Sequence, residues 1–167
     1  MKNADAPSTT DEKRQLLRHT LATVVYRGRK VLVGAPEGFA EFCVNEGSRT
    51  PGDILAHICD LYDWANWLAK GEHVYNETRP GEWAADIDRF FVALATLDAY
   101  LASDQPLGRT PELLFQGPIA DSLTHIGQIA MLRRIAGAPV RGESYARADI
   151  TVGRVGPDQA PPNWEFD

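Results

Sequence analysis

The chain has 167 residues and a formal net charge of −6 at pH 7, which is enough sequence for one domain with its own hydrophobic core. Its lysines and arginines are scattered, so we expect no nucleic-acid partner, because binding to phosphates requires a basic surface. No apolar run approaches the roughly 20 residues that cross a bilayer, and residues 1–15 contain no apolar segment of a secretory signal. We therefore expect a cytoplasmic protein without a membrane partner.

Two cysteines, Cys43 and Cys59, lie sixteen positions apart and form no CxxC motif. In a cytosolic protein this spacing favours reduced thiols over a disulfide. We expect both residues to be small side chains without a chemical role.

The first predicted helix begins after Thr10, a suitable N-cap residue that is followed by acidic residues. Its apolar residues recur at helical spacing: Leu16, Leu17, Leu21, Val24 and Val25. The end of this helix is ambiguous, because residues 24–34 also fit a short strand and Gly28 weakens a helix. A loop with a small apolar cluster follows over residues 35–49.

The second predicted helix covers residues 51–70 and has the clearest boundaries in the chain. Thr50 is the N-cap, Pro51 occupies the first helical position and Asp53 completes a capping box. Gly71 follows the last turn, where a glycine typically ends a helix.

A third helix is predicted over residues 82–103, where aromatic and aliphatic residues recur three and four positions apart. Residues 111–117 predict a short helical turn, and a fourth helix begins at Pro118 and ends at Gly137. Residues 138–167 are rich in glycine and proline and lack helical periodicity, so they predict an extended tail laid on the surface or on a partner.

These elements together predict an all-α protein, a four-helix bundle over residues 10–137 with an irregular C-terminal tail. Its fourth helix contains the stretch DSLTHIGQIAMLRR, in which Asp121 and His125 lie one turn apart on the same face. Apolar residues surround most of this helix, which predicts that neighbouring helices enclose it. Because a buried carboxylate without a partner is unfavourable, we expect a compensating group near Asp121.

His57 on the second helix is the candidate for that group. It lies three residues after Ile54 and four before Leu61, beside an apolar stripe, and should point toward the bundle interior or its rim. Helix bundles build metal sites from inward side chains on facing helices. The two imidazoles of His57 and His125 with the carboxylate of Asp121 suit one divalent transition metal with open positions for water or substrate.

A simpler interpretation of the same residues stays open. A histidine near an apolar face is commonly hydrogen-bonded within the core. Asp121 also falls in the first turn after Pro118, where the positive end of a helix favours a carboxylate. In that case no metal binds, and Asp121 hydrogen-bonds to His125 or His57.

Two segments, ILAHICDLYDWA in the second helix and DSLTHIGQIAMLRRIAGAPV in the fourth, resemble the DinB superfamily of four-helix bundles. That family typically has one histidine early in the second helix and an HxxxHRGQ motif in the fourth, and its three histidines bind a divalent metal. His57 matches the histidine of the second helix. His125, which directly precedes Ile126-Gly127-Gln128, matches the histidine before Arg-Gly-Gln.

The chain departs from the family pattern at two positions. Asp121 stands where the family more often has its other histidine, and this carboxylate makes a harder site that fits zinc, nickel, iron(II) or manganese. Ile126 replaces an arginine and removes a cation near the site. The resemblance covers roughly residues 10–137 and leaves the tail without a counterpart. Dimers are frequent in the family, so the resemblance also implies a homodimer.

Characterised relatives in this superfamily include transferases and isomerases that use a low-molecular-weight thiol. The resemblance therefore implies a metal-dependent enzyme acting on small molecules, of the thiol S-transferase or hydrolase type. A three-ligand metal would lower the pKa of a bound thiol or water and produce a nucleophile near neutral pH. Asp60 and Gln128 are candidates for hydrogen bonds to the imidazole rings, although Asp60 also fits a solvated surface acid, which we favour.

The alternative function is a non-catalytic metal-binding bundle with a structural or stress-related sensor role. An open coordination position reached from solvent would favour the enzyme, whereas a fourth protein ligand would favour the structural role.

Several other side chains have a structural interpretation that we favour over a functional one. Aromatic residues at helical spacing on the second helix are expected in the core rather than at a pocket mouth: Tyr62, Trp64 and Trp67. Arg133 and Arg134 are expected to be exposed cations at a helix C-terminus rather than substrate-binding groups. His19 and His73 have no partner at metal-ligand spacing and are expected on the surface.

Overall fold

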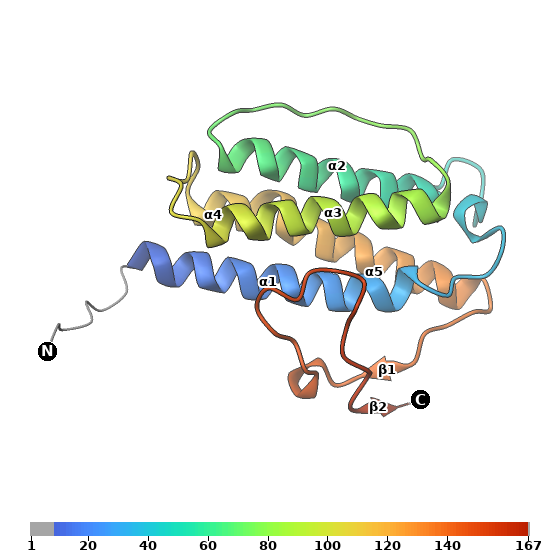
Figure 1. Cartoon of the computed structure of the whole chain (residues 1–167). Helices are drawn as coiled ribbons and strands as arrows, with labels where there is room; N and C mark the ends of the chain where they lie inside the picture. The colour runs from blue at the N-terminus through green and yellow to red at the C-terminus, as the bar shows by residue number, and fades with distance from the viewer. Residues whose placement is uncertain (1–8, 167) are drawn as a thin grey trace, which may run out of the picture.

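The computed structural model describes residues 9–166 and is mostly helical (Figure 1). Four long helices lie side by side in this part of the chain: α1 (Thr9–Leu32), α2 (Pro51–Ala69), α3 (Trp83–Ala102) and α5 (Ala120–Ile135). Both α1 and α2 pack against α3 and α5. The predicted all-α class is therefore confirmed. Residues 1–8 are part of the polar stretch 1–15 on which we based the expectation of no secretory signal, and they lie outside the described residues.

An apolar core fills the space between the helices. Its side chains come from all four long helices: Leu21, Val24, Leu55, Ile58, Tyr62, Phe90, Leu94, Leu97, Ile126 and Ile129 among others. Each large side chain that is fully buried contributes about 1.5–3 kcal/mol to folding.

In residues 9–166, no helix is both long enough and apolar enough to span a membrane.

Helix α1 continues to Leu32, so the alternative of a short strand over residues 24–34 is wrong. Gly28 does not interrupt it, because the glycine is used for close packing. A Cβ atom at this position would lie 2.6 Å from Cζ of Phe90 on α3. The missing side chain therefore lets α1 approach α3 closely enough to bury the Phe90 ring.

Helix α2 begins with the predicted capping box. The Thr50 hydroxyl accepts a hydrogen bond from the Asp53 backbone N–H, and the Asp53 carboxylate accepts one from the Thr50 backbone N–H. The helix ends at Ala69, and Gly71 follows with a positive φ of 94°. A short 3-10 helix, η1 (Phe39–Glu41), precedes α2 and buries Phe39 against the core.

The predicted break before the fourth helix is wrong. The helical conformation begins with α4 (Pro111–Leu114), continues through a π-helical turn, η2 (Phe115–Ile119), and passes directly into α5. Pro118 has no N–H group to donate, and it lies within the wider π turn without ending the helix. Asp121 is therefore well inside a helical segment, and the alternative in which a helix N-terminus stabilises its carboxylate does not apply.

The C-terminal tail lies on α1 (Figure 1), which confirms an extended segment on the surface. Its two short strands, β1 (Gly142–Glu143) and β2 (Glu165–Phe166), pair antiparallel, and a 3-10 turn, η3 (Tyr145–Arg147), follows β1. Lys30 of α1 forms ion pairs with both Glu143 and Glu165 at 2.7 Å. These contacts hold both strands to the same turn of α1.

Candidate metal centre

Helices α2 and α5 bring the three predicted metal ligands together. His57 lies on α2, Asp121 and His125 lie on α5, and one ligand atom from each lies within 4.8 Å of the other two. His57 Nε2 is 3.6 Å from Asp121 Oδ2, and His125 Nε2 is 3.4 Å from Asp121 Oδ1. The two imidazole rings are perpendicular, with centroids 4.7 Å apart. The carboxylate thus faces an Nε2 atom of each ring.

The spacing of these atoms is compatible with metal ligands and longer than a hydrogen bond. An N–H···O hydrogen bond spans about 2.7–3.2 Å, and both imidazole–carboxylate distances exceed that range. Two ligand atoms bound at about 2.1 Å to a tetrahedral metal ion lie about 3.4 Å apart. The His57, Asp121 and His125 group could therefore hold a metal ion.

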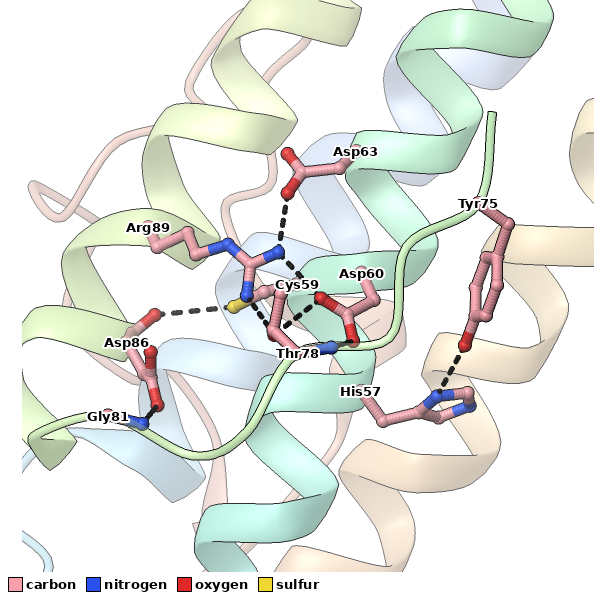
Figure 2. A network of polar contacts seen from close by, with 9 residues as sticks. All are labelled: His57, Cys59, Asp60, Asp63, Tyr75, Thr78, Gly81, Asp86 and Arg89. Atoms are coloured by element: carbon pink, nitrogen blue, oxygen red, sulfur yellow. Dashed lines mark hydrogen bonds and ion pairs between the residues drawn. The ribbon is translucent and has the colours of Figure 1, made fainter. Parts of the chain in front are cut away.

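The outer nitrogen of each ring has its own partner. His125 Nδ1 is 2.8 Å from Oε1 of Gln128, one turn further along α5. Because this amide oxygen only accepts, the contact requires a proton on Nδ1, and a neutral ring would then present the lone pair of Nε2 to Asp121. His57 Nδ1 is 3.2 Å from the hydroxyl of Tyr75, which lies in the connection between α2 and α3 (Figure 2).

The local charges favour the form of His57 that binds metals. Burial lowers the pKa of His57 below its ordinary value, and the electrostatic interactions with His125 and Arg49 lower it further, while Asp121 only partly offsets these effects. Metal ions bind the neutral imidazole. Burial raises the pKa of Tyr75, with smaller contributions from Asp60 and Glu77, so its hydroxyl keeps its proton.

Solvent reaches the group from one side. The side chains of His57 and His125 are 21% and 12% exposed, whereas that of Asp121 is 47% exposed. Asp121 lines a hollow of about 400 Å³ together with Trp64 and Gly117, and His57 lines a smaller one of about 140 Å³. Within residues 9–166, no fourth His, Cys, Asp or Glu joins the group. A bound metal would thus keep positions open toward solvent.

The exposure of Asp121 corrects the expectation that neighbouring helices enclose its helix. One face of α5 packs against α1 and α2, and the opposite face is open to solvent. Met131 and Ile135 are more than half exposed on α5. Apolar residues around a helix therefore did not imply burial, and the argument from a buried, uncompensated carboxylate does not hold for Asp121.

Asp60 is neither a surface acid nor a partner of an imidazole. Its residue is 1% exposed, and its carboxylate accepts hydrogen bonds from the Thr78 backbone N–H at 2.8 Å and the Thr78 hydroxyl at 2.7 Å. Arg89 of α3 donates to the same carboxylate at 2.6 Å (Figure 2). The expectation of a solvated surface acid is therefore wrong.

Arg133 differs from the exposed cation that we expected. It is 7% exposed and donates hydrogen bonds to backbone carbonyls at the end of α1 and after α5, among them Val31, Gly34 and Ala138. These contacts satisfy carbonyl groups at two helix ends. The guanidinium of Arg133 is therefore bonded to the backbone and not available to bind a substrate. Arg134 is exposed, as predicted.

The remaining side chains mostly follow the sequence. Tyr62 is buried in the core, His19 and His73 are exposed, and both cysteines are free. Of the other two aromatic residues of α2, Trp64 packs against the core and also lines the hollow beside Asp121, whereas Trp67 differs from the prediction because it is 37% exposed.

No protein-family model, curated protein or solved structure matches this chain. The resemblance to the DinB superfamily therefore rests on the two segments that contain His57, Asp121 and His125.

Proposed function

We propose that this chain is a DinB-type four-helix bundle and a metal-dependent enzyme acting on small molecules by thiol transfer or hydrolysis. In this proposal His57, Asp121 and His125 hold one divalent transition metal. The observation that carries it is the convergence of two imidazole Nε2 atoms and a carboxylate at 3.4 and 3.6 Å, without a hydrogen bond between them.

The lone pairs of the facing ligand atoms support the proposal that a cation binds between them. Gln128 fixes the proton of neutral His125 on Nδ1, so its Nε2 lone pair faces an oxygen of Asp121 that also carries lone pairs. Two such atoms repel each other unless a positive charge lies between them. A proton would draw them to hydrogen-bond distance, whereas a metal ion keeps them near the observed separation.

The open side of the group supports an enzyme over a structural metal site. Structural zinc sites are closed by four protein ligands, whereas catalytic sites have three and an open position. Here three candidate ligands are present in residues 9–166 and Asp121 borders a hollow. When bound, a metal would lower the pKa of a thiol or water in that position. In the alternative, a non-catalytic metal-binding or sensor bundle, the open coordination position of the metal would have no catalytic role.

The first test is the metal content of protein purified without a metal-chelating tag. We expect near-stoichiometric zinc, nickel, iron or manganese in the wild type and its loss in His57→Ala, Asp121→Ala and His125→Ala. His73→Ala is the matched control, because His73 is an exposed histidine outside the group, and it should keep the metal. A wild type that neither carries nor takes up any of these four metals would overturn the proposal.

A second test separates the enzyme from the non-catalytic bundle. Metal-loaded protein is screened for transfer of small thiols to electrophiles and for hydrolysis of small esters and amides, with Asp121→Ala as the blank. Turnover that requires both the metal and Asp121 supports the enzyme. A stoichiometric metal without turnover in any of these reactions favours the structural or sensor role.

A further inference from the structure

The connection between α2 and α3, residues 70–82, runs past His57, one of the three candidate metal ligands (Figure 2). Tyr75 in this connection points its hydroxyl at Nδ1 of His57, 3.2 Å away. Its ring also contacts Trp64 of α2 edge to face, with centroids 5.8 Å apart. Tyr75 thus touches the side of His57 that faces away from Asp121.

A buried anchor fixes this connection three residues further along. Asp60 accepts two hydrogen bonds from Thr78, one from its backbone N–H and one from its hydroxyl. Arg89 of α3 donates to Asp60 at 2.6 Å and to the Thr78 hydroxyl at 2.9 Å. Asp63 accepts a further hydrogen bond from Arg89 at 2.5 Å. Helices α2 and α3 therefore hold Thr78 in place from both sides.

A second contact fixes the far end of the connection. The Gly81 backbone N–H donates to the Asp86 carboxylate at 2.8 Å, and Asp86 is 8% exposed at the start of α3. An irregular segment with few apolar contacts would otherwise be free to move. With Thr78 and Gly81 both fixed, the position of Tyr75 is set by the fold of the chain and not by its own packing alone.

We propose that Tyr75 is a positioning residue for the metal centre, held against His57 by the contacts among Asp60, Thr78 and Arg89. This inference rests on the proposed function, because it assigns the residue that orients one of the three ligands. It also gives Asp60 and Arg89 an indirect role, since they form hydrogen bonds to Thr78 and to each other.

The two histidines differ in how their outer nitrogens are held. Gln128 Oε1 can only accept, so it fixes one tautomer of His125. The Tyr75 hydroxyl can donate to Nδ1 of His57 or accept from its N–H, so it satisfies either tautomer. The His57 ring can therefore carry its proton on Nε2 or, as metal binding through Nε2 would require, on Nδ1. Tyr75 keeps the ring orientation the same in both states.

The test compares Tyr75→Phe with Tyr100→Phe, a matched control that removes a tyrosine hydroxyl that donates to the Pro106 carbonyl. Zinc affinity is measured by competition with a chelator, together with the thermal midpoint of the metal-free protein. We expect Tyr75→Phe to weaken zinc binding about 10- to 100-fold, as for other groups that orient metal-bound histidines, and Tyr100→Phe to leave it unchanged. Equal zinc affinity of Tyr75→Phe and the wild type would overturn the inference.

A second readout does not depend on the metal. In the metal-free protein, Tyr75→Phe should shift the ¹⁵N resonance of His57 Nδ1 and leave that of His125 in place, whereas Tyr100→Phe should shift neither. If the wild type binds no zinc, the proposed function fails, and an unchanged His57 resonance would separately overturn the contact with Tyr75.

The anchor is tested with Thr78→Val, which removes the hydroxyl shared by Asp60 and Arg89 and keeps the backbone N–H. We expect weaker zinc binding than in the wild type and tighter binding than in Tyr75→Phe. Wild-type affinity in Thr78→Val would overturn the role of the anchor.

Discussion

Two clusters of ionisable side chains in this molecule have opposite characters. The first joins the tail to α1, where Lys30 forms ion pairs at 2.7 Å with Glu143 and Glu165, and Tyr26 donates to Glu143 at 2.6 Å. The second is the candidate metal centre, whose imidazole–carboxylate distances are 3.4 and 3.6 Å. In the first cluster every donor meets an acceptor at hydrogen-bond distance. In the second, the facing atoms form no hydrogen bond.

This difference separates a structural cluster from a candidate functional one. The Glu143 side chain is fully buried and that of Lys30 is 11% exposed, so their contacts replace water and leave no group unpaired. The candidate metal centre is open to solvent, and the Asp121 side chain is 47% exposed. The donors of the tail cluster are paired within the chain, whereas the three residues of the candidate metal centre could hold a metal ion.

The largest expected effect is on stability, and it tests this contrast directly. Removing the buried carboxylate in Glu143→Ala leaves Lys30 with only the Glu165 carboxylate, and we expect the free energy of unfolding to fall by about 3 kcal/mol. Asp121→Ala in the metal-free protein should change it by no more than about 0.5 kcal/mol, because its side chain is half exposed and has no hydrogen bond to lose. Urea denaturation in the presence of a chelator measures both. Similar losses in the two variants would contradict the contrast.

The second effect is stabilisation by the metal. A ligand that binds only the folded protein, at 100 times its dissociation constant, stabilises it by about 2.7 kcal/mol. We expect zinc to raise the unfolding free energy of the wild type and of Glu143→Ala by this amount and to leave Asp121→Ala unchanged. Denaturation at fixed free zinc provides the measurement. Stabilisation of Asp121→Ala equal to that of the wild type would place the metal elsewhere.

A smaller effect is expected at Gln128. Gln128→Ala removes the acceptor that fixes the His125 tautomer, and we expect zinc affinity to fall about tenfold. Gln15→Ala, at an exposed position of α1, is the matched control and should bind zinc as the wild type does. Chelator competition distinguishes the two, and equal affinities would show that His125 needs no orientation by Gln128.

The smallest effect is the response of the tail cluster to acid. Burial raises the pKa of Glu143, but hydrogen bonds from Lys30 and Tyr26 outweigh it, and the net pKa lies below the ordinary 4.5. Stability from this group is present above pH 4.5 and is lost as the pH falls through the lower folded pKa. Unfolding free energies between pH 7 and pH 3 should therefore decline more steeply in the wild type than in Glu143→Gln. Parallel curves would mean that Glu143 is not stabilised as a carboxylate.

The sequence predicted best the elements whose signals lie in neighbouring residues. The start of α2 depends on Thr50 and Asp53, which satisfy each other's backbone groups within one turn. The passage from α4 to α5 was mispredicted because Pro118 normally begins or breaks a helix, and its place inside a π turn depends on packing. Gly28 was read as a weakness because the contact that requires it, with Phe90, is far away in the sequence.

The site was predictable to a similar degree. Asp121 and His125 are four positions apart in the sequence, and this spacing predicts that they lie one turn apart on the same face of a helix. The opposite position of His57 depends on the register of α2 against α5, which the apolar stripe only indicated. Tyr75 was missed because it lies in an irregular connection without periodicity. The burial of Asp60 was missed because its partner Arg89 lies on another helix.

The central claim is that His57, Asp121 and His125 bind one metal ion through two imidazoles and oxygen. X-ray absorption spectroscopy of the zinc-loaded protein tests it most directly. We predict nitrogen and oxygen ligands at about 2.0–2.2 Å, outer-shell scattering from two imidazoles and no sulfur, with loss of this spectrum in Asp121→Ala. A sulfur ligand, or fewer than two imidazoles, would contradict the account.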